Sequence, residues 1–288
     1  MLRTRVLTAL VLLLVLAAAA MVSLMALLGL GAIFMGVALY EWLLLSDVAR
    51  PCARTAAAVT TAAALALEAA AWAPSPAVLA ALCALACGAW LLIALLLARI
   101  ERGWGSGLDG RVHIAPALLV GAAVLLTGAA WFSLSALLHH GALWTLSVLA
   151  LVWLADSAAY FTGRAFGRSK LAVRISPGKT WAGVWGALAT VLAVAEFLRW
   201  GWPGLDTWST RLLQAAPVAG LLVLVAAVAA SIAGDLFESL VKRQAGVKDS
   251  GWILPGHGGV WDRIDASLPV LPLAVLSHWL LAGGWSRG

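Results

Sequence analysis

The chain has 288 residues, of which 63% are hydrophobic and only 11% are charged, and its net charge is +6. Soluble domains are about half apolar and about a quarter charged, so this composition excludes an ordinary soluble enzyme. It predicts an all-α polytopic integral membrane protein, whose active site must be built from helix ends and loops. The basic residues lie in short loops between apolar runs, which favours contact with anionic lipid headgroups over nucleic-acid binding.

The apolar runs, taken in chain order, predict about nine transmembrane helices. The first run, 6–45, has twice the length that one helix needs, so we expect two helices joined by a turn near 21–23. A cleaved signal peptide is the alternative there, but the apolar stretch resumes at once. The later runs are 56–73, 77–98, 115–133, 142–160, 181–198, 212–234 and 266–282.

The distribution of basic residues predicts the orientation. With a cytoplasmic N-terminus, 16 of the 19 Lys and Arg residues fall on the cytoplasmic side, as the positive-inside rule requires. The large polar loops, 161–180 and 235–265, then face the cytoplasm. We divide the chain into N-terminal membrane helices over 1–133, with about five spans, and a C-terminal catalytic membrane region over 134–288. A bacterial inner (cytoplasmic) membrane is the expected location.

Acidic residues of the C-terminal region are spaced as pairs. Asp235 and Glu238 are three residues apart, as are Asp262 and Asp265, so each pair shares one face of a helical segment. Two such pairs brought together would supply the hard oxygen ligands that Mg²⁺ prefers. A plain ion pair with Lys242 is the alternative for the first pair.

Basic residues and glycine-rich turns accompany these acids. Ammonium and guanidinium groups beside a carboxylate-held cation suit a polyphosphate substrate. The turns 176–180 and 255–259 allow backbone amides to approach a phosphate, although the Gly-Lys-Thr of the first lacks the P-loop spacing. His257 is either a phosphate donor or general base, or a structural turn residue. Asp156 lies near the end of an apolar run, where an unpaired carboxylate is costly, so we expect it to have a cationic partner.

The segment from Ser239 to Asp265 resembles the signature of the phosphatidate cytidylyltransferases (CDP-diacylglycerol synthases). It contains Ser, Lys-Arg, Lys-Asp, Pro-Gly-His-Gly-Gly and Asp-Arg-x-Asp at the family spacing. Further blocks that agree lie at 155–171 and 176–183. The first half of the chain is similar only in hydropathy and in its Glu41-Trp42 pair.

The resemblance implies that the phosphate of phosphatidic acid attacks the α-phosphorus of CTP, which forms CDP-diacylglycerol and pyrophosphate in phospholipid biosynthesis. It places Mg²⁺ on Asp235 and Asp262, with Glu238 and Asp265 as further candidate ligands and a second cation such as K⁺ as an open alternative. The implied catalytic residues are Asp235, Asp262, Lys242, Arg243, Lys248, His257 and Arg263. The implied substrate-binding residues are Asp156, Ser176, Lys179, Thr180, Ser239, Asp249, Gly258 and Gly259.

The implied partners are CTP, phosphatidic acid and membrane lipid, and the family's tendency toward dimers makes a homodimer an expectation. Ala182 stands where the family usually has Glu or Gln, and Ala266 where Ser commonly follows the last Asp. Three alternatives to the implied reaction stay open. They are a related CTP-dependent enzyme with another lipid phosphate or a polyprenol or phytol alcohol as acceptor, a catalytically silent member, and a cation transporter.

Overall fold

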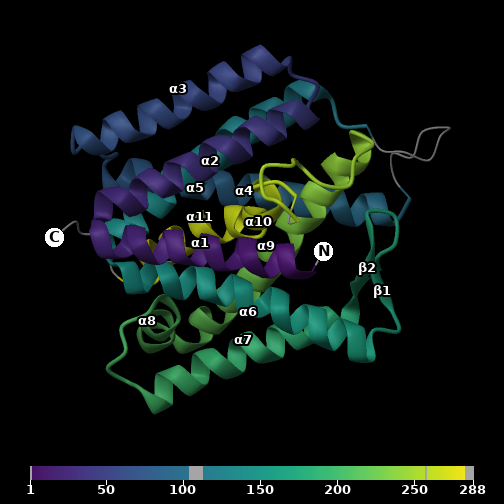
Figure 1. Ribbon diagram of the computed structural model, residues 1–288. Helices are drawn as coiled ribbons and strands as arrows, with labels where there is room; N and C mark the ends of the chain where they lie inside the picture. Colours follow the sequence, from purple (N-terminus) through teal and green to yellow (C-terminus); the bar gives the residue numbers. More distant parts are fainter. Residues whose placement is uncertain (1, 104–112, 257, 283–288) are drawn as a thin grey trace.

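The computed structural model describes residues 2–103, 113–256 and 258–282, and these form a helical bundle with one small hairpin (Figure 1). The helices of the N-terminal half are α1 (Leu2–Val22), α2 (Leu24–Leu45), α3 (Arg50–Ala69), α4 (Pro76–Glu101) and α5 (Pro116–His140). Those of the C-terminal half are α6 (Ala142–Phe166), α7 (Trp181–Gly201), α8 (Trp208–Ala215), α9 (Pro217–Gln244), α10 (Trp261–Ile264) and α11 (Ser267–Leu281).

The helix boundaries follow local signals in the sequence. Ser23 separates α1 from α2 and caps α2 by accepting a hydrogen bond from the backbone N–H of Ala26 at 3.1 Å, which confirms the predicted break near 21–23. A proline occupies the first turn of α3, α4, α5 and α9, where its missing N–H costs nothing. Thr180 caps α7, and Thr207 forms a capping box with Thr210 at the start of α8.

Seven of the helical stretches in the described part of the chain are long and apolar enough to cross a membrane: α2, α4, α5, α6, α7, α9 and Trp261–Leu281, which joins α10 to α11. The chain is therefore a polytopic membrane protein. The apolar part of α1, Leu10–Val22, is shorter, and α3 falls outside this set. The count of nine spans accordingly stays a prediction.

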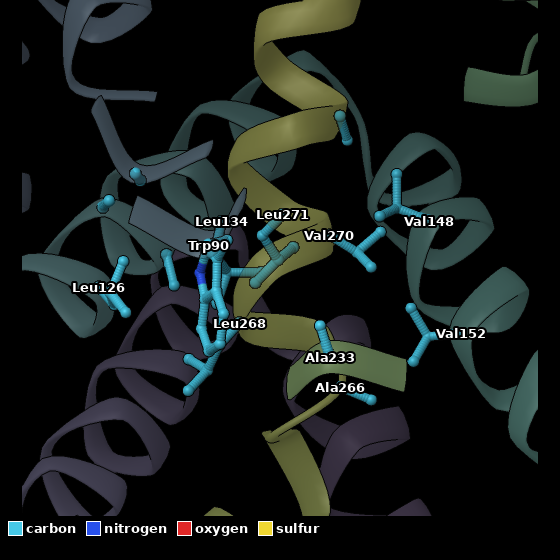
Figure 2. Packing of buried hydrophobic residues seen from close by; sticks show 14 of the residues in the cluster. Trp90, Leu126, Leu134, Val148, Val152, Ala233, Ala266, Leu268, Val270 and Leu271 are labelled. Atoms are coloured by element: carbon cyan, nitrogen blue, oxygen red, sulfur yellow. The ribbon is translucent and has the colours of Figure 1, made fainter. Parts of the chain in front are cut away.

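The core of the bundle is organised around α11, which packs against α4, α5 and α9. Leu268, Val270 and Leu271 of this helix are buried, and Figure 2 shows them beside Trp90 of α4 and Val148 of α6. Lipid is as apolar as these side chains, so close packing rather than the hydrophobic effect must hold the helices together.

The expectation of an all-α polytopic structure is confirmed, with one addition: β1 (Lys170–Ala172) and β2 (Ser176–Thr180) form a small antiparallel hairpin between α6 and α7. The predicted polar loop 161–180 is thus largely ordered as the end of α6 and this hairpin. The side chain of Glu101, at the end of α4, accepts the backbone N–H groups of Arg174 (3.0 Å) and Ile175 (2.9 Å) at the turn.

The predicted loop 235–265 is also shorter than expected, because α9 continues to Gln244 and α10 begins at Trp261. The apolar run ends near 234, but the polar residues that follow keep helical spacing and share one face of the helix. The side chain of Gln244 holds the end of α9 by pairing with the backbone N–H (2.9 Å) and carbonyl (2.8 Å) of Ile114.

The crossing of α9 and the α10–α11 turn generates a stability prediction. A Cβ added at Gly234 would overlap the carbonyl oxygen of Asp265 and lie 3.1 Å from Cδ of Pro269. We expect Gly234→Ala to lower the free energy of unfolding by about 1–3 kcal/mol, because a backbone carbonyl cannot move aside without shifting a helix. Gly88→Ala is the matched control, since a Cβ there has nothing within 4 Å. Equal melting temperatures for the two detergent-solubilised variants would contradict the prediction.

Candidate active site

One cavity of about 750 Å³ opens among α6, the β-hairpin, α7, α9 and α10. This volume lies within the range of sites that bind nucleotide-sized ligands. Six acidic and six basic residues line its wall. They are Asp156, Asp235, Glu238, Asp249, Asp262 and Asp265, together with Arg164, Lys179, Lys242, Arg243, Lys248 and Arg263.

Asp262, at the start of α10, has both carboxylate oxygens engaged. Oδ1 accepts a hydrogen bond from Nζ of Lys242 at 2.5 Å. Oδ2 accepts from the backbone N–H groups of Ser250 and Gly259, both at 2.9 Å, and lies 3.1 Å from Oγ of Ser250. The loop between α9 and α10 is therefore folded around this carboxylate.

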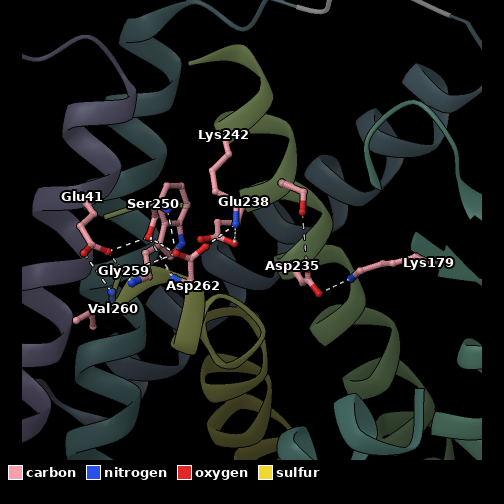
Figure 3. A network of polar contacts seen from close by, with 11 residues as sticks. Glu41, Lys179, Asp235, Glu238, Lys242, Ser250, Gly259, Val260 and Asp262 are labelled. Carbon is pink, nitrogen blue, oxygen red and sulfur yellow. Dashed lines mark hydrogen bonds and ion pairs between the residues drawn. The ribbon is translucent and has the colours of Figure 1, made fainter. Parts of the chain in front are cut away.

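Lys242 of α9 pairs with Asp262 of α10 in the cavity wall (Figure 3). Its ammonium group contacts Glu238 at 2.8 Å as well as Asp262, and the side chains of the three residues are 13%, 2% and 7% exposed. Oε1 of Glu238 is buried and has no hydrogen-bond partner among the described residues. Two carboxylates thus share one cation, and one buried oxygen retains an unused lone pair.

A second ammonium group, that of Lys179, pairs with another carboxylate of the cavity wall. Nζ of Lys179 lies 2.6 Å from Oδ2 of Asp235, and Oγ of Ser239 donates to Oδ1 of the same aspartate at 3.4 Å. Lys179 lies on β2, whereas Asp235 and Ser239 lie on α9. The hairpin therefore delivers a basic side chain to the acidic face of α9 (Figure 3).

The structure brings nearly all of the predicted site residues to this cavity. Those in its wall are Asp156, Ser176, Lys179, Thr180, Asp235, Glu238, Ser239, Lys242, Arg243, Lys248, Asp249, Asp262, Arg263 and Asp265. Gly258 and Gly259 lie outside the wall. Gly259 supplies a backbone N–H to Asp262, and Gly258 has a φ of +83°, which favours glycine. His257 lies outside the described residues.

Two residues at the site were not assigned a role from the sequence. Glu41 of α2 is 1% exposed and accepts hydrogen bonds from the loop between α9 and α10, and Ser250 in that loop contacts both Glu41 and Asp262. The available signal for Glu41 was a carboxylate inside an apolar run, which is costly unless it has partners. Ser250 gave no comparable signal.

The donor set suits a hard cation. Carboxylate oxygens from α6, α9 and the α10 region face one cavity, and the buried Oε1 of Glu238 is unpaired within residues 2–103, 113–256 and 258–282. In the described part of the chain, no three acidic, histidine or cysteine side chains already converge as a metal site. The ammonium groups of Lys179 and Lys242 lie among these carboxylates instead.

Comparison with known proteins places these residues in a family. The chain matches the cytidylyltransferase family over residues 3–281. It is 47% identical over 135 residues to a phosphatidate cytidylyltransferase of Haemophilus influenzae, covering 46% of this chain and 45% of that protein. Over 140 residues it is 46% identical to the Pseudomonas aeruginosa phosphatidate cytidylyltransferase, covering 49% and 48% of the two chains.

A phosphatidate cytidylyltransferase of Thermotoga maritima is 40% identical over 151 residues, which cover 50% of this chain and 52% of that protein. The chain thus spans about half the length of these curated relatives in each match.

The shared ammonium group generates a prediction about stability. We expect Lys242→Met to lower the free energy of unfolding by about 3–5 kcal/mol, because it leaves Glu238 and Asp262 buried beside each other without a cation. Adding Glu238→Gln should restore part of the loss, since it removes one of the two charges. Denaturant titration of the detergent-solubilised variants measures both effects. Lys248→Met, at an exposed lysine of the same cavity wall, is the matched control.

Proposed function

Because the chain belongs to the cytidylyltransferase family, we propose that it transfers the cytidylyl group of CTP to phosphatidic acid and releases pyrophosphate. The observation that carries the proposal is a single cavity in which six acidic and six basic side chains meet at the ends of membrane helices. Such a cavity suits a reaction between a nucleoside triphosphate and a lipid phosphate, because both substrates are polyanions and one of them resides in the membrane.

In the proposed reaction, an oxygen of the lipid phosphate attacks the α-phosphorus of CTP. The bond from this phosphorus to the oxygen that bridges to the β-phosphorus breaks, and pyrophosphate leaves with that electron pair. The lipid phosphate is already an anion at neutral pH, so no covalent enzyme intermediate is needed. Catalysis then consists mainly of positioning and charge stabilisation.

The basic side chains of the cavity would hold the phosphates. The cavity wall includes Arg243, Lys248 and Arg263 beside its acidic residues, and these three side chains can neutralise the triphosphate. Lys179 and Lys242 are paired with carboxylates in the structure, and each would be shared with substrate phosphate when CTP binds. Ser176 and Thr180, on β2, lie in the same wall and would donate hydrogen bonds to the substrates.

We propose that Mg²⁺ is the cofactor, held by Asp235 and Asp262 with Glu238 and Asp265 close by. The residues fit this ion, because their oxygens are hard ligands and Oε1 of Glu238 is buried with no partner in the part of the chain that the structure describes. When bound, Mg²⁺ supplies positive charge that screens the phosphates and orients the triphosphate. The carboxylates would then exchange their ammonium partners for the cation.

Lipid would reach the cavity sideways, along the exposed faces of α6 and α7. Tyr160 lines the cavity and is exposed, and Phe161, Trp181 and Trp185 are exposed apolar side chains on the same two helices. Such an edge allows acyl chains to remain in the bilayer while the phosphate enters the cavity. We place the protein in a bacterial inner membrane with this cavity on the cytoplasmic side, where CTP is available, and a homodimer stays a prediction.

The test is CTP-dependent pyrophosphate release by detergent-solubilised protein supplied with phosphatidic acid and Mg²⁺. We expect EDTA to abolish release and Asp235→Asn or Asp262→Asn to reduce it by roughly 100-fold or more, because each variant removes a proposed metal ligand. Release of CDP with a polyprenol or phytol acceptor would instead indicate transfer of the γ-phosphoryl group of CTP to an alcohol.

Asp206→Asn is the matched control for these variants. Asp206 pairs with Arg211 at 2.7 Å beyond the far end of α7, which is about 30 Å long, so its loss should leave activity unchanged. Full activity of either Asp235→Asn or Asp262→Asn would refute the metal assignment, and no product with any lipid phosphate would refute the proposed reaction.

A further inference from the structure

We propose that Glu41, on the second helix of the chain, is a positioning residue that holds Asp262 in the active site. The inference rests on the proposed function for its catalytic consequence. Its structural part stands independently, because it concerns hydrogen bonds between α2 and the loop that ends at α10. Glu41 lines no part of the cavity, so it acts through other residues.

The carboxylate of Glu41 binds the α9–α10 loop at three points. Oε1 accepts the backbone N–H of Val260 at 3.1 Å, and Oε2 accepts the backbone N–H of Trp261 at 2.8 Å and Oγ of Ser250 at 3.0 Å. Figure 3 shows Glu41 entering this network from α2 on the side opposite Lys242. Hydrogen bonds to a carboxylate are stronger than those between neutral groups, so this anchor is substantial.

Ser250 connects the anchor to the proposed metal ligand. Its Oγ lies 3.0 Å from Oε2 of Glu41 and 3.1 Å from Oδ2 of Asp262. The neighbouring N–H of Gly259 donates to the same Oδ2 of Asp262 at 2.9 Å. The two carboxylates therefore bind alternate groups of one loop, and displacement of the loop from Glu41 would also move the donors of Asp262.

Steric fit supports the same reading. A Cβ added at Gly251 or at Gly259 would overlap the carboxyl group of Glu41. The loop thus uses residues without side chains where it passes around this carboxylate. In addition, Trp42, the residue after Glu41, stacks on Trp261, with ring centroids 4.4 Å apart and planes 8° apart. The start of α10 is therefore held by two consecutive residues of α2.

Charge alone does not account for Glu41, because in the described part of the chain its partners are two backbone amides and one hydroxyl. A carboxylate within an apolar helix is costly, and a residue that served only to fill space could be apolar. Two acceptor oxygens aimed at one loop instead indicate that the side chain determines loop geometry.

The experiment compares Glu41→Gln with Glu68→Gln. Glu68 is also a buried carboxylate of the N-terminal half, 8% exposed, and it bonds to Ser135 and His139 away from the cavity. Glutamine presents one acceptor oxygen and an NH₂ group, so Glu41→Gln must face at least one loop donor with another donor. Glu68→Gln removes the same charge without touching the loop.

The first measurement is hydrogen–deuterium exchange of peptides that cover 250–264, which requires no substrate. We expect faster exchange in Glu41→Gln than in the unaltered protein and in Glu68→Gln, because at least one of the N–H groups of Val260 and Trp261 loses its acceptor. Unchanged exchange in this segment would overturn the proposal even if activity fell. This readout also separates the inference from the proposed function, since it holds whether or not CTP is turned over.

The second measurement is the Mg²⁺ dependence of pyrophosphate release. We expect Glu41→Gln to raise the Mg²⁺ concentration for half-maximal rate, or to lower kcat, by roughly 10–100-fold, as loss of groups that orient metal ligands does. The KM for CTP should change much less, because the basic wall is untouched. An equal loss in Glu68→Gln, or a fall confined to the KM for CTP, would contradict positioning of Asp262.

Ser250→Ala provides a second route in case Glu41→Gln does not fold. It removes the hydroxyl between the two carboxylates. It leaves both carboxylates in place, together with the backbone N–H groups that donate to Glu41 and to Asp262. We expect the same direction of change in Mg²⁺ dependence. In the double variant, the combined effect should be smaller than the product of the two single effects, because both act on one loop. Independent, multiplicative effects would overturn the connection through Ser250.

Discussion

A carboxylate at the end of a membrane helix must be neutralised or hydrogen-bonded, and the architecture of this site follows from that requirement. Glu238 and Asp262 are nearly inaccessible, and Lys242 lies between them. Its ammonium group ties α9 to α10, which begins the segment that leads into the central helix α11. The hairpin adds Lys179 to Asp235 in the same way. The charges that suit the site for phosphate chemistry therefore also join its elements.

No described residue of α1 to α5 lines the cavity, yet these helices hold two segments next to it, the α9–α10 loop and the hairpin. Glu41 of α2 binds the loop before α10, and Glu101 at the end of α4 binds the turn of the hairpin. In both cases a carboxylate accepts backbone N–H groups of a turn or of the residues that begin a helix. Each contact satisfies main-chain N–H groups and at the same time fixes the geometry of the segment that carries them. The two halves of the chain thus have distinct roles, support and chemistry.

Much of the site could be predicted from the sequence, because the chemistry depends on residue type and spacing. The acid pairs at 235/238 and 262/265, and the lysines near them, lie in one cavity as expected. The hairpin was missed, since β1 and β2 have only three and five residues and leave no apolar alternation to detect. The end of α9 was placed too early, because hydropathy falls where the helix turns one polar face to the cavity. The hydrogen-bond partners of Glu41 could not be predicted from the sequence either, since they lie more than 200 residues away along the chain.

The separation between Glu41 and its partners, 209 to 220 residues, bears on how the protein is made. Synthesis proceeds from the N-terminus, so α2 enters the bilayer long before Ser250 and Trp261 have been translated. During that interval Glu41 must lack its native partners, and the faces of α4, α5 and α9 that later enclose α11 must be covered by lipid or by one another. Among the described helices, α11 is translated after all the others, and its insertion follows that of the loop that Glu41 binds. A chain truncated before Ser250 would therefore keep the carboxyl group of Glu41 in a membrane helix without these three donors, an arrangement that is costly in hydrocarbon.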